Sequence, residues 1–223
     1  MRNEINEIEL VLLIGDMKPE TIIELLQQNG YNIESVLEGK EELKKYLYFD
    51  TPDKTLYHSG ESLRIRLAKE AGGRHKVTYK VPNVPRTEEG YANRKEYNAA
   101  FSEEPILENA LEKFFVEYPE VGLPNNLQHV VNVDKTRSTY ELTSRDGETA
   151  ELAFEDVLAI DPNNNAIQKR LTREMEVELR SAPTEILDDI RTIIKSYDPS
   201  IISSKKSKYN LALEAIEEQQ WTK

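Results

Sequence analysis

Hydrophobic and polar residues alternate with a period of two over much of this chain, which is the pattern of β-strands with one buried face. In residues 6–14, for example, Ile8, Leu10 and Leu12 share one face, whereas Glu7 and Glu9 share the other. The same alternation, bounded by turn residues, predicts a series of extended segments. They cover residues 6–14, 33–50, 62–69, 75–81, 91–101, 130–142, 149–160 and 170–180.

Helical periodicity and helix-end signals occur between these extended segments. Pro19 suits the first turn of a helix that ends near Gly30, and Ile22 and Leu26 lie on its apolar face. Further helices are predicted over residues 105–118, 183–197 and 209–219.

Short turns connect the predicted strands as antiparallel neighbours. TPD at residues 51–53 is a turn signal, and AGG at residues 71–73 and RDG at residues 145–147 each join two strands as a hairpin. About eight strands with three or four helices favour an α+β fold. We expect a closed antiparallel β-barrel, or a strongly curled sheet, with the helices packed outside.

The polar faces of these strands carry charges of one sign at positions two or four residues apart. A solvated outer face would explain one such strand, because half-wet antiparallel strands are common. The whole set is harder to explain in this way, since like charges about 7 Å apart repel unless a ligand offsets them. Basic faces carry Arg64 and Arg66, Lys76 and Lys80, and Lys135 and Arg137, whereas acidic faces carry Glu151 and Glu155, and Glu174, Glu176 and Glu178.

The helices indicate which way the charged faces point. Their apolar stripes need a sheet face to cover, and the apolar faces of the strands are the ones available. If the helices cover the outside, the charged faces line the inside of the barrel. Such a lumen suits a complex of metal and polyphosphate, because carboxylates bind Mg²⁺ or Mn²⁺ while Arg and Lys bind phosphate oxygens.

Composition narrows the function classes further. The 223 residues are 38% hydrophobic and 31% charged, as in a globular protein, and no linker divides residues 1–223 into two domains. A net charge of −12 argues against a nucleic-acid-binding surface, and the lack of cysteine excludes thiolate zinc sites. The acidic N-terminus is unlike a signal peptide, and no apolar run approaches the roughly 20 residues that span a bilayer. We therefore expect a cytoplasmic protein without a membrane partner, either a monomer or a homodimer.

A series of short motifs runs in order along nearly the whole chain. The motifs are EIE at residues 7–9, YFDTPD at 48–53, GESLRIR at 60–66, TYK at 78–80, RKE at 94–96, KTR at 135–137, FED at 154–156, EVE at 176–178 and SKY at 207–209. In this order they resemble the CYTH superfamily, the triphosphate tunnel metalloenzymes. That superfamily includes class IV adenylate cyclases, thiamine triphosphatases and inorganic triphosphatases.

The resemblance implies an eight-stranded antiparallel barrel whose tunnel holds a triphosphate-containing small molecule together with Mg²⁺ or Mn²⁺. The implied metal-side acids are Glu7, Glu9, Glu96, Glu155, Glu176 and Glu178, with Glu155 where the family usually has aspartate. The implied phosphate-binding bases are Arg64, Arg66, Lys80, Arg94, Lys135, Arg137 and Lys208, of which Lys80, Arg137 and Lys208 are the catalytic candidates. Lys205 and Lys206 are alternatives to Lys208, and Glu174 either extends the acidic row or lies at the rim.

Two positions depart from the family pattern. Val11 stands where the first strand usually has lysine, and Asn98 stands where the fifth strand often has a further glutamate. The first change removes a phosphate contact, and the second alters a metal-binding group.

Three functions are consistent with this sequence. The leading one is metal-dependent hydrolysis of an inorganic or organic triphosphate, the second is adenylate cyclase activity, and the third is binding of polyphosphate or nucleotide without catalysis. Hydrolysis of this kind requires no serine or cysteine nucleophile and no histidine base. The scattered His58, His75 and His129 are accordingly expected in ordinary surface or packing positions.

Overall fold

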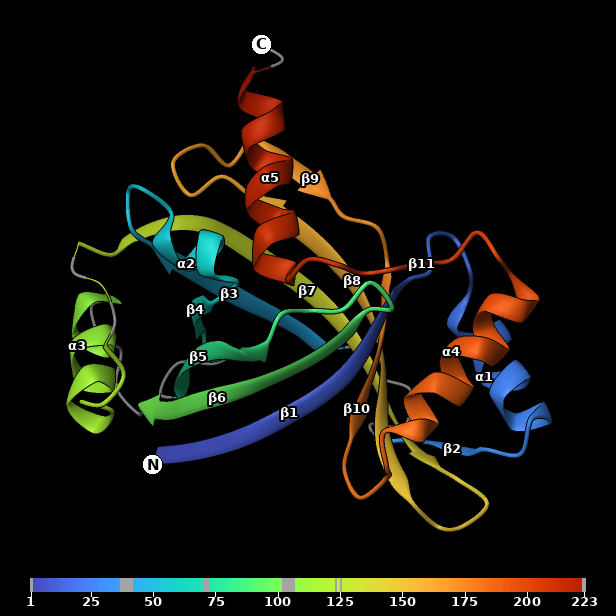
Figure 1. Ribbon diagram of the computed structural model, residues 1–223. Helices are drawn as coiled ribbons and strands as arrows, with labels where there is room; N and C mark the ends of the chain where they lie inside the picture. Colours follow the sequence, from blue (N-terminus) through green and yellow to red (C-terminus); the bar gives the residue numbers. More distant parts are fainter. Residues whose placement is uncertain are drawn as a thin grey trace.

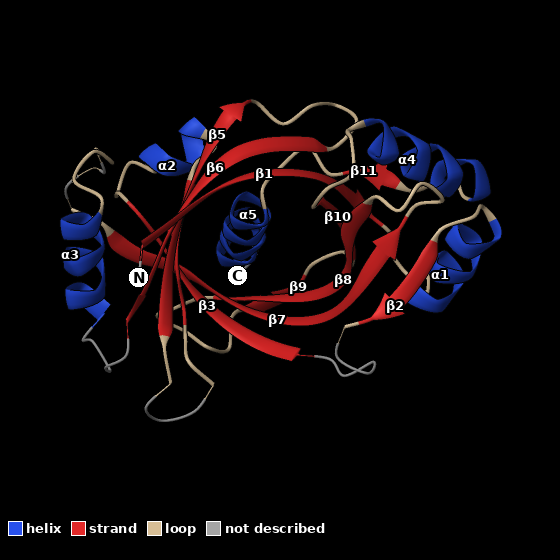
Figure 2. Cartoon of the chain, turned by 90° about the horizontal axis from the view of Figure 1, so that it is seen from below, coloured by secondary structure: helices blue, strands red, loops and turns tan. Residues whose placement is uncertain are grey.

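The computed structural model describes residues 2–36, 42–69, 73–101, 107–122, 124 and 126–221. Within this part of the chain, eight antiparallel strands form a closed barrel (Figures 1 and 2). The strands are β1 (Arg2–Leu13), β3 (Glu42–Asp50), β4 (Ser62–Arg66), β5 (His75–Val84), β6 (Tyr91–Phe101), β7 (Gln128–Thr143), β8 (Thr149–Ile160) and β10 (Glu174–Leu179). Around the barrel the order is β7, β3, β4, β5, β6, β1, β10 and β8, and β8 pairs again with β7.

Three short strands and five helices complete the described part of the fold. The strands β2 (Asn32–Ser35), β9 (Gln168–Arg170) and β11 (Ile202–Ser203) pair with β7, β8 and β1 respectively. The helices are α1 (Pro19–Gln28), α2 (Thr55–Ser59), α3 (Leu107–Glu117), α4 (Glu185–Tyr197) and α5 (Lys208–Trp221). None of the helices in the described residues is long and apolar enough to cross a membrane.

The expected fold, a closed eight-stranded antiparallel barrel with helices outside it, is confirmed. Helices α1, α3, α4 and α5 occupy the four segments where helical periodicity was found. Pro105, where the helix predicted over residues 105–118 was expected to start, lies outside the described residues, as do Ala71 and Gly72 of the first hairpin turn.

Two local features differ from the pattern in the sequence. The segment predicted as one strand over residues 170–180 is divided into β9 and β10, although both pair with β8. Arg170 lies opposite Leu158 and Glu174 opposite Glu155, so this segment has one residue more than β8 between the two pairs. Such an extra residue interrupts the ladder as a β-bulge does. The second difference is the short helix α2, which follows the expected turn at residues 51–53.

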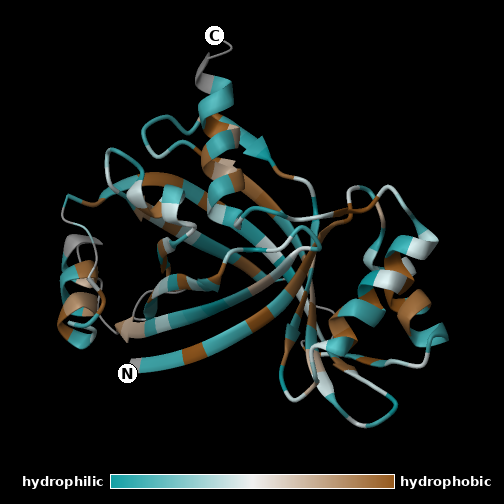
Figure 3. Cartoon of the chain, viewed as in Figure 1, coloured by the Kyte–Doolittle hydropathy of each residue, from teal (hydrophilic) through white to brown (hydrophobic). Residues whose placement is uncertain are grey.

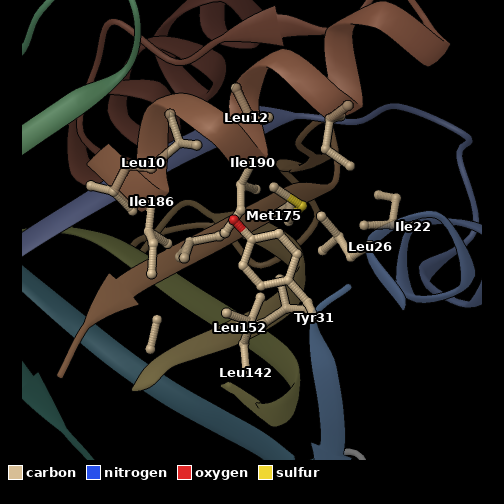
Figure 4. Packing of buried hydrophobic residues seen from close by; sticks show 14 of the residues in the cluster. Leu10, Leu12, Ile22, Leu26, Tyr31, Leu142, Leu152, Met175, Ile186 and Ile190 are labelled. Carbon is tan, nitrogen blue, oxygen red and sulfur yellow. The ribbon is translucent and has the colours of Figure 1, made fainter. Parts of the chain in front are cut away.

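Two hydrophobic layers cover the outside of the barrel. Helices α1 and α4 pack against the outer faces of β1, β8 and β10, where Leu10, Leu152 and Met175 are fully buried (Figure 4). On the other side, α3 packs through Phe114 against the outer faces of β3 to β6. Alternating hydrophilic and hydrophobic bands are visible along β1 in Figure 3. With the apolar face used in these layers, the charged face of each strand points inward.

Helix α5 lies over one mouth of the barrel and is seen end-on within the ring of strands in Figure 2. It packs on the inner faces of β3, β7 and β8, with Leu213 against the cluster that includes Val133 and Val157. The ring of Tyr209, in its first turn, stacks on Tyr48 of β3 at a centroid distance of 5.4 Å. This packing fixes the start of α5 above the interior of the barrel.

Asp50 holds α2 and α5 in place from the end of β3. Its carboxylate is fully buried and accepts hydrogen bonds from the backbone amides of Leu56 (2.9 Å) and Tyr57 (2.9 Å) in α2. It also accepts a hydrogen bond from the amide of Thr51 (2.7 Å) and another from the hydroxyl of Tyr209 (2.6 Å). One carboxylate therefore links the barrel wall to both helices at this mouth.

Replacing this carboxylate is expected to destabilise the protein strongly. Asp50→Ala leaves several buried donors without an acceptor, so we expect a loss of about 3 kcal/mol in the free energy of unfolding. Denaturant unfolding measures this loss. Asp53→Ala is the matched control in the same motif, because Asp53 is exposed and its side chain bonds only groups next to it in the chain, such as Thr51 and Thr55. Equal losses in the two variants would contradict this role of Asp50.

Candidate active site

The inward-facing side chains meet in one cavity of about 340 Å³ that runs through the barrel, referred to below as the tunnel. All seven predicted bases line it, and so do the predicted acids other than Glu155. Glu155 is fully buried in the tunnel wall and is bonded to three of those bases. Barrel closure thus brings together charged groups that lie up to about 200 residues apart, from Glu7 on β1 to Lys208 on α5.

The first group of ion pairs joins β1, β5 and β6. Lys80 Nζ lies 2.9 Å from Glu7 Oε2 and also pairs with Glu96, which is directly opposite it in the strand register. Arg94 Nε lies 2.6 Å from Glu7 Oε2 and the same guanidinium bonds Glu9. Burial by itself would raise the pKa of Glu7, but Lys80 and Arg94 outweigh it and hold that pKa well below its usual range. Glu7 is therefore ionised in the ligand-free protein.

The second group joins β7, β8, β10 and α5. Lys208 Nζ lies 2.8 Å from Glu174 Oε2 and 2.7 Å from Glu176 Oε1, and it also bonds Glu155. Arg137 bridges Glu155 and Glu176 from β7, at 2.8 Å from Glu176 Oε2. Burial by itself would raise the pKa of Glu155, but the surrounding bases outweigh this effect and lower the pKa to about 2. Lys208 therefore lies among these acids, whereas Lys206, which also lines the tunnel, pairs with Glu214.

A third set of bases has no carboxylate partner within the described residues. Arg64, Arg66 and Lys76 line the tunnel on β4 and β5, where Arg66 and Lys76 are direct cross-strand neighbours. Arg64 lies over the ring of Tyr46 at 4.7 Å, donates to the hydroxyl of Tyr48, and has a buried Nε without a hydrogen-bond partner. Burial and the like charges of Arg64 and Arg66 lower the pKa of Lys76. This basic strip is therefore a place where a bound anion would be stabilised.

Three acids of the second group are close enough together to bind a metal ion. Carboxylate oxygens of Glu155, Glu174 and Glu176 lie within 4.8 Å of one another. Such hard oxygen donors fit Mg²⁺ or Mn²⁺, although the ammonium of Lys208 now lies among them. Glu174, which the sequence left either in the acidic row or at the rim, is buried deep in the tunnel wall.

Several tunnel residues were not among the predicted site residues. Lys76 lies on the same strand face as Lys80 and could have been found from that alternation. Tyr46 and Tyr48 lie on β3, where Tyr48 is the cross-strand neighbour of Arg64 on β4. Arg86 lies in the loop after β5, where no periodicity indicates its direction. His58, His75 and His129 do not line the tunnel, and His129 packs on the ring of Phe49 instead.

A closed antiparallel barrel with a tunnel lined by acids and bases defines the class of this protein. The sequence profile of the CYTH domain matches residues 7–210, and the chain belongs to the CYTH family. A search among curated protein sequences gave no match.

Solved structures with the same fold share little sequence with this chain. One is a protein from Hippeastrum, described as a candidate adenylyl cyclase with a dominant triphosphatase activity. It has a TM-score of 0.57 and 17% identity, over 93% of this chain and 95% of the other. Another is a candidate adenylate cyclase from Bacillus halodurans, with a TM-score of 0.56 and 20% identity, over 92% and 96% of the two chains.

The basic strip and Lys135 are expected to make Tyr46 titrate early. Burial would raise the pKa of Tyr46, but Lys135 and Arg64 lower it to about 8. Because this is below the unfolded value of about 10, the native state releases a proton first, and stability rises between pH of about 8 and about 10. That contribution is lost as the pH falls through about 8. Tyrosinate absorbance should show this early step, and Tyr46→Phe should remove both the step and the rise in stability.

The exposed Tyr197 provides the control for this titration. Tyr197→Phe should keep the early step. If an early step survives in Tyr46→Phe, it belongs to another tyrosine and the electrostatic description of the strip is wrong.

Removing Lys208 should expose the metal-binding capacity of the three acids. Lys208→Met takes a cation away from Glu155, Glu174 and Glu176. We therefore expect its free energy of unfolding to be about 3 kcal/mol lower than that of the unaltered chain when a chelator keeps metal out of the solution. Mn²⁺ should restore more stability to this variant than it adds to the unaltered chain, because the ammonium no longer competes. Urea unfolding with and without Mn²⁺ measures both effects.

Lys54→Met is the matched control, since Lys54 pairs with Glu217 on α5 and does not line the tunnel. It should respond to Mn²⁺ as the unaltered chain does. An equal response of Lys208→Met and Lys54→Met would show that the three acids are not a metal site.

Proposed function

We propose that this protein is a Mg²⁺- or Mn²⁺-dependent hydrolase that removes the terminal phosphate of a triphosphate bound in the tunnel. One observation carries the proposal: bases without carboxylate partners in the described residues line the same cavity of about 340 Å³ whose wall holds a buried set of acids. The first can neutralise a polyanion, and the second offers oxygen ligands to a metal. A solvated protein surface has no need for this arrangement.

Substrate binding would begin at the basic strip. Arg64 and Arg66 offer planar guanidinium forks, which match phosphate oxygens with two parallel hydrogen bonds, and Lys76 adds a point charge. Arg94 and Lys135 would turn from their present carboxylate partners to the phosphate groups. The substrate would relieve the repulsion within the strip, which is why a triphosphate should bind much better than a monoanion.

Glu155, Glu174 and Glu176 would hold the metal, and the family pattern adds Glu7, Glu9, Glu96 and Glu178 to the acidic side. When bound, Mg²⁺ or Mn²⁺ supplies positive charge to the phosphate oxygens and lowers the pKa of a coordinated water. The remaining carboxylates orient the attacking water by accepting its hydrogen bonds.

Catalysis would depend on charge stabilisation by groups already in position. A water oxygen would form the new bond to the terminal phosphorus and lose its proton to solvent, while the bond to the bridging oxygen breaks and the diphosphate product leaves with the bonding electrons. Lys80, Arg137 and Lys208 point into the tunnel and would stabilise the charge that develops on those oxygens. No covalent enzyme intermediate is needed.

A second candidate function is cyclisation of ATP to cyclic AMP with release of pyrophosphate. It is favoured by a second pocket of about 420 Å³, which shares Arg86, Arg94, Lys206 and Ser207 with the tunnel lining. Such a pocket has room for the organic part of a nucleotide whose phosphates lie in the tunnel. The names of the Hippeastrum and Bacillus halodurans proteins also include this activity.

A substrate panel tests the proposed function. Incubation with tripolyphosphate, ATP or thiamine triphosphate and either metal should release orthophosphate from at least one substrate. Lys80→Met and Glu176→Gln should each lower turnover at least about a hundredfold, because each removes a charged group from the reaction site. Lys95→Met is the control, since Lys95 lies on the outer face of β6 and pairs with Glu4.

The products separate the three functions. Orthophosphate supports the hydrolase, cyclic AMP with pyrophosphate supports the cyclase, and tight binding without turnover under either metal leaves a binding protein. Folded protein that neither binds nor cleaves any of these triphosphates would sink the proposal.

A further inference from the structure

Val11 leaves the tunnel wall without the cation that the family pattern places there. Its side chain faces the tunnel from β1, two residues beyond Glu9, and is 2% exposed. Across the strand pair it lies opposite Glu176. A lysine at this position would present its ammonium between two acids, whereas valine presents only methyl groups.

The loop after β5 is fastened to β1 at this same residue. The amide of Val11 donates to the carbonyl of Gly90 at 3.1 Å, and Gly90 in turn closes a tight turn by donating to Thr87 at 3.1 Å. Gly90 has a φ of +91°, and a Cβ there would lie 2.6 Å from the Val11 carbonyl oxygen. Only glycine allows so close an approach. The loop position is therefore set by the backbone of Val11.

Arg86 directly precedes that turn and reaches into the tunnel. Its Nη2 lies 2.9 Å from Glu9 Oε1, and its side chain is only 11% exposed. Its Nη1 is buried without any hydrogen-bond partner among the described residues. A buried donor without a partner destabilises the ligand-free protein, and a ligand that accepts its hydrogen bond would remove this cost.

The ion pair with Glu9 does not by itself account for Arg86. The same Oε1 atom of Glu9 already accepts a hydrogen bond from Arg94, so the carboxylate has a counter-charge without Arg86. Arg86 and Arg94 thus meet at one carboxylate oxygen, and Arg94 also pairs with Glu7. Arg86 lines both the tunnel and the second pocket, so its guanidinium lies where the two spaces join.

We propose that Arg86 supplies from the loop the phosphate-binding cation that the family pattern supplies from position 11. It would bind the phosphate group of a triphosphate nearest the second pocket, through the Nη1 donor that now has no partner. This inference rests on the proposed function, because it names a further residue of the same binding site. The loop position set by Gly90 is what allows a residue so far along the chain to take this role.

Calorimetric titration with tripolyphosphate, first with a chelator and then with Mn²⁺, tests whether Arg86 takes the role that the family pattern gives to a lysine at position 11. Arg86→Met should weaken binding roughly ten- to a hundredfold, the size expected for a hydrogen bond to a charged group. Adding Val11→Lys to Arg86→Met should restore most of the lost affinity. Arg145→Met, which removes the same charge from an exposed turn, should bind as the unaltered chain does. Arg86→Lys keeps the charge, and its affinity for tripolyphosphate should lie between those of Arg86→Met and the unaltered chain.

Each outcome decides the question. Unchanged affinity in Arg86→Met, at unchanged folding, overturns the inference and leaves Arg86 as a partner of Glu9 only. Weaker binding that Val11→Lys does not restore also overturns it, because the two positions are then not equivalent. If Arg86→Met does not fold, comparison of Arg86→Lys with and without Val11→Lys gives the same decision. If the unaltered chain does not bind tripolyphosphate, the same titrations use whichever of ATP and thiamine triphosphate it binds, and failure to bind any of the three overturns the proposed function itself.

Discussion

The pairing of charges inside a closed barrel is the constraint on which the rest of this structure depends. Closure buries many of the acids and bases, and a buried charge without a partner is much more costly than a paired one. The strand register supplies the pairs, because Glu7 lies opposite Arg94, Lys80 opposite Glu96 and Glu155 opposite Arg137. A register shift of one residue would turn these groups outward and bring apolar residues into the tunnel.

Helix α5 completes this network with two adjacent residues, Lys208 and Tyr209, whose side chains contact different parts of the barrel. Lys208 enters the acids of β8 and β10, while Tyr209 stacks on Tyr48 and donates to the carboxylate of Asp50. Asp50 also bonds the first amides of α2, so the same buried group positions both helices. The place of a charged side chain in the tunnel is thus determined by packing and hydrogen bonds at the barrel mouth. Among the tunnel bases in the described residues, only Arg64, Arg66 and Lys76 remain without an acidic partner, which gives the tunnel a preferred side for an anion.

Much of the fold could be predicted because the alternation in the strands is strict. The faces of Arg64 and Arg66, or of Glu176 and Glu178, follow from a period of two, and the helices showed which face had to be covered. Other features could not be read from the sequence because they depend on closure. The position of Glu174 depends on where β10 meets β8, and the partners of Lys208 come from two strands that are distant along the chain. Arg86 was missed because a loop has no periodicity, and its direction depends on the contact between Gly90 and Val11.

The central claim is that this charge arrangement holds a triphosphate and a divalent metal inside the barrel. A crystal structure grown with tripolyphosphate and Mn²⁺ tests it most directly, because anomalous scattering locates the metal independently of the phosphates. The account predicts phosphate density against Arg64, Arg66 and Lys76, together with a Mn²⁺ peak at the carboxylates of Glu155, Glu174 and Glu176. An empty tunnel at saturating tripolyphosphate, or an anion bound only to the outer surface, would contradict it.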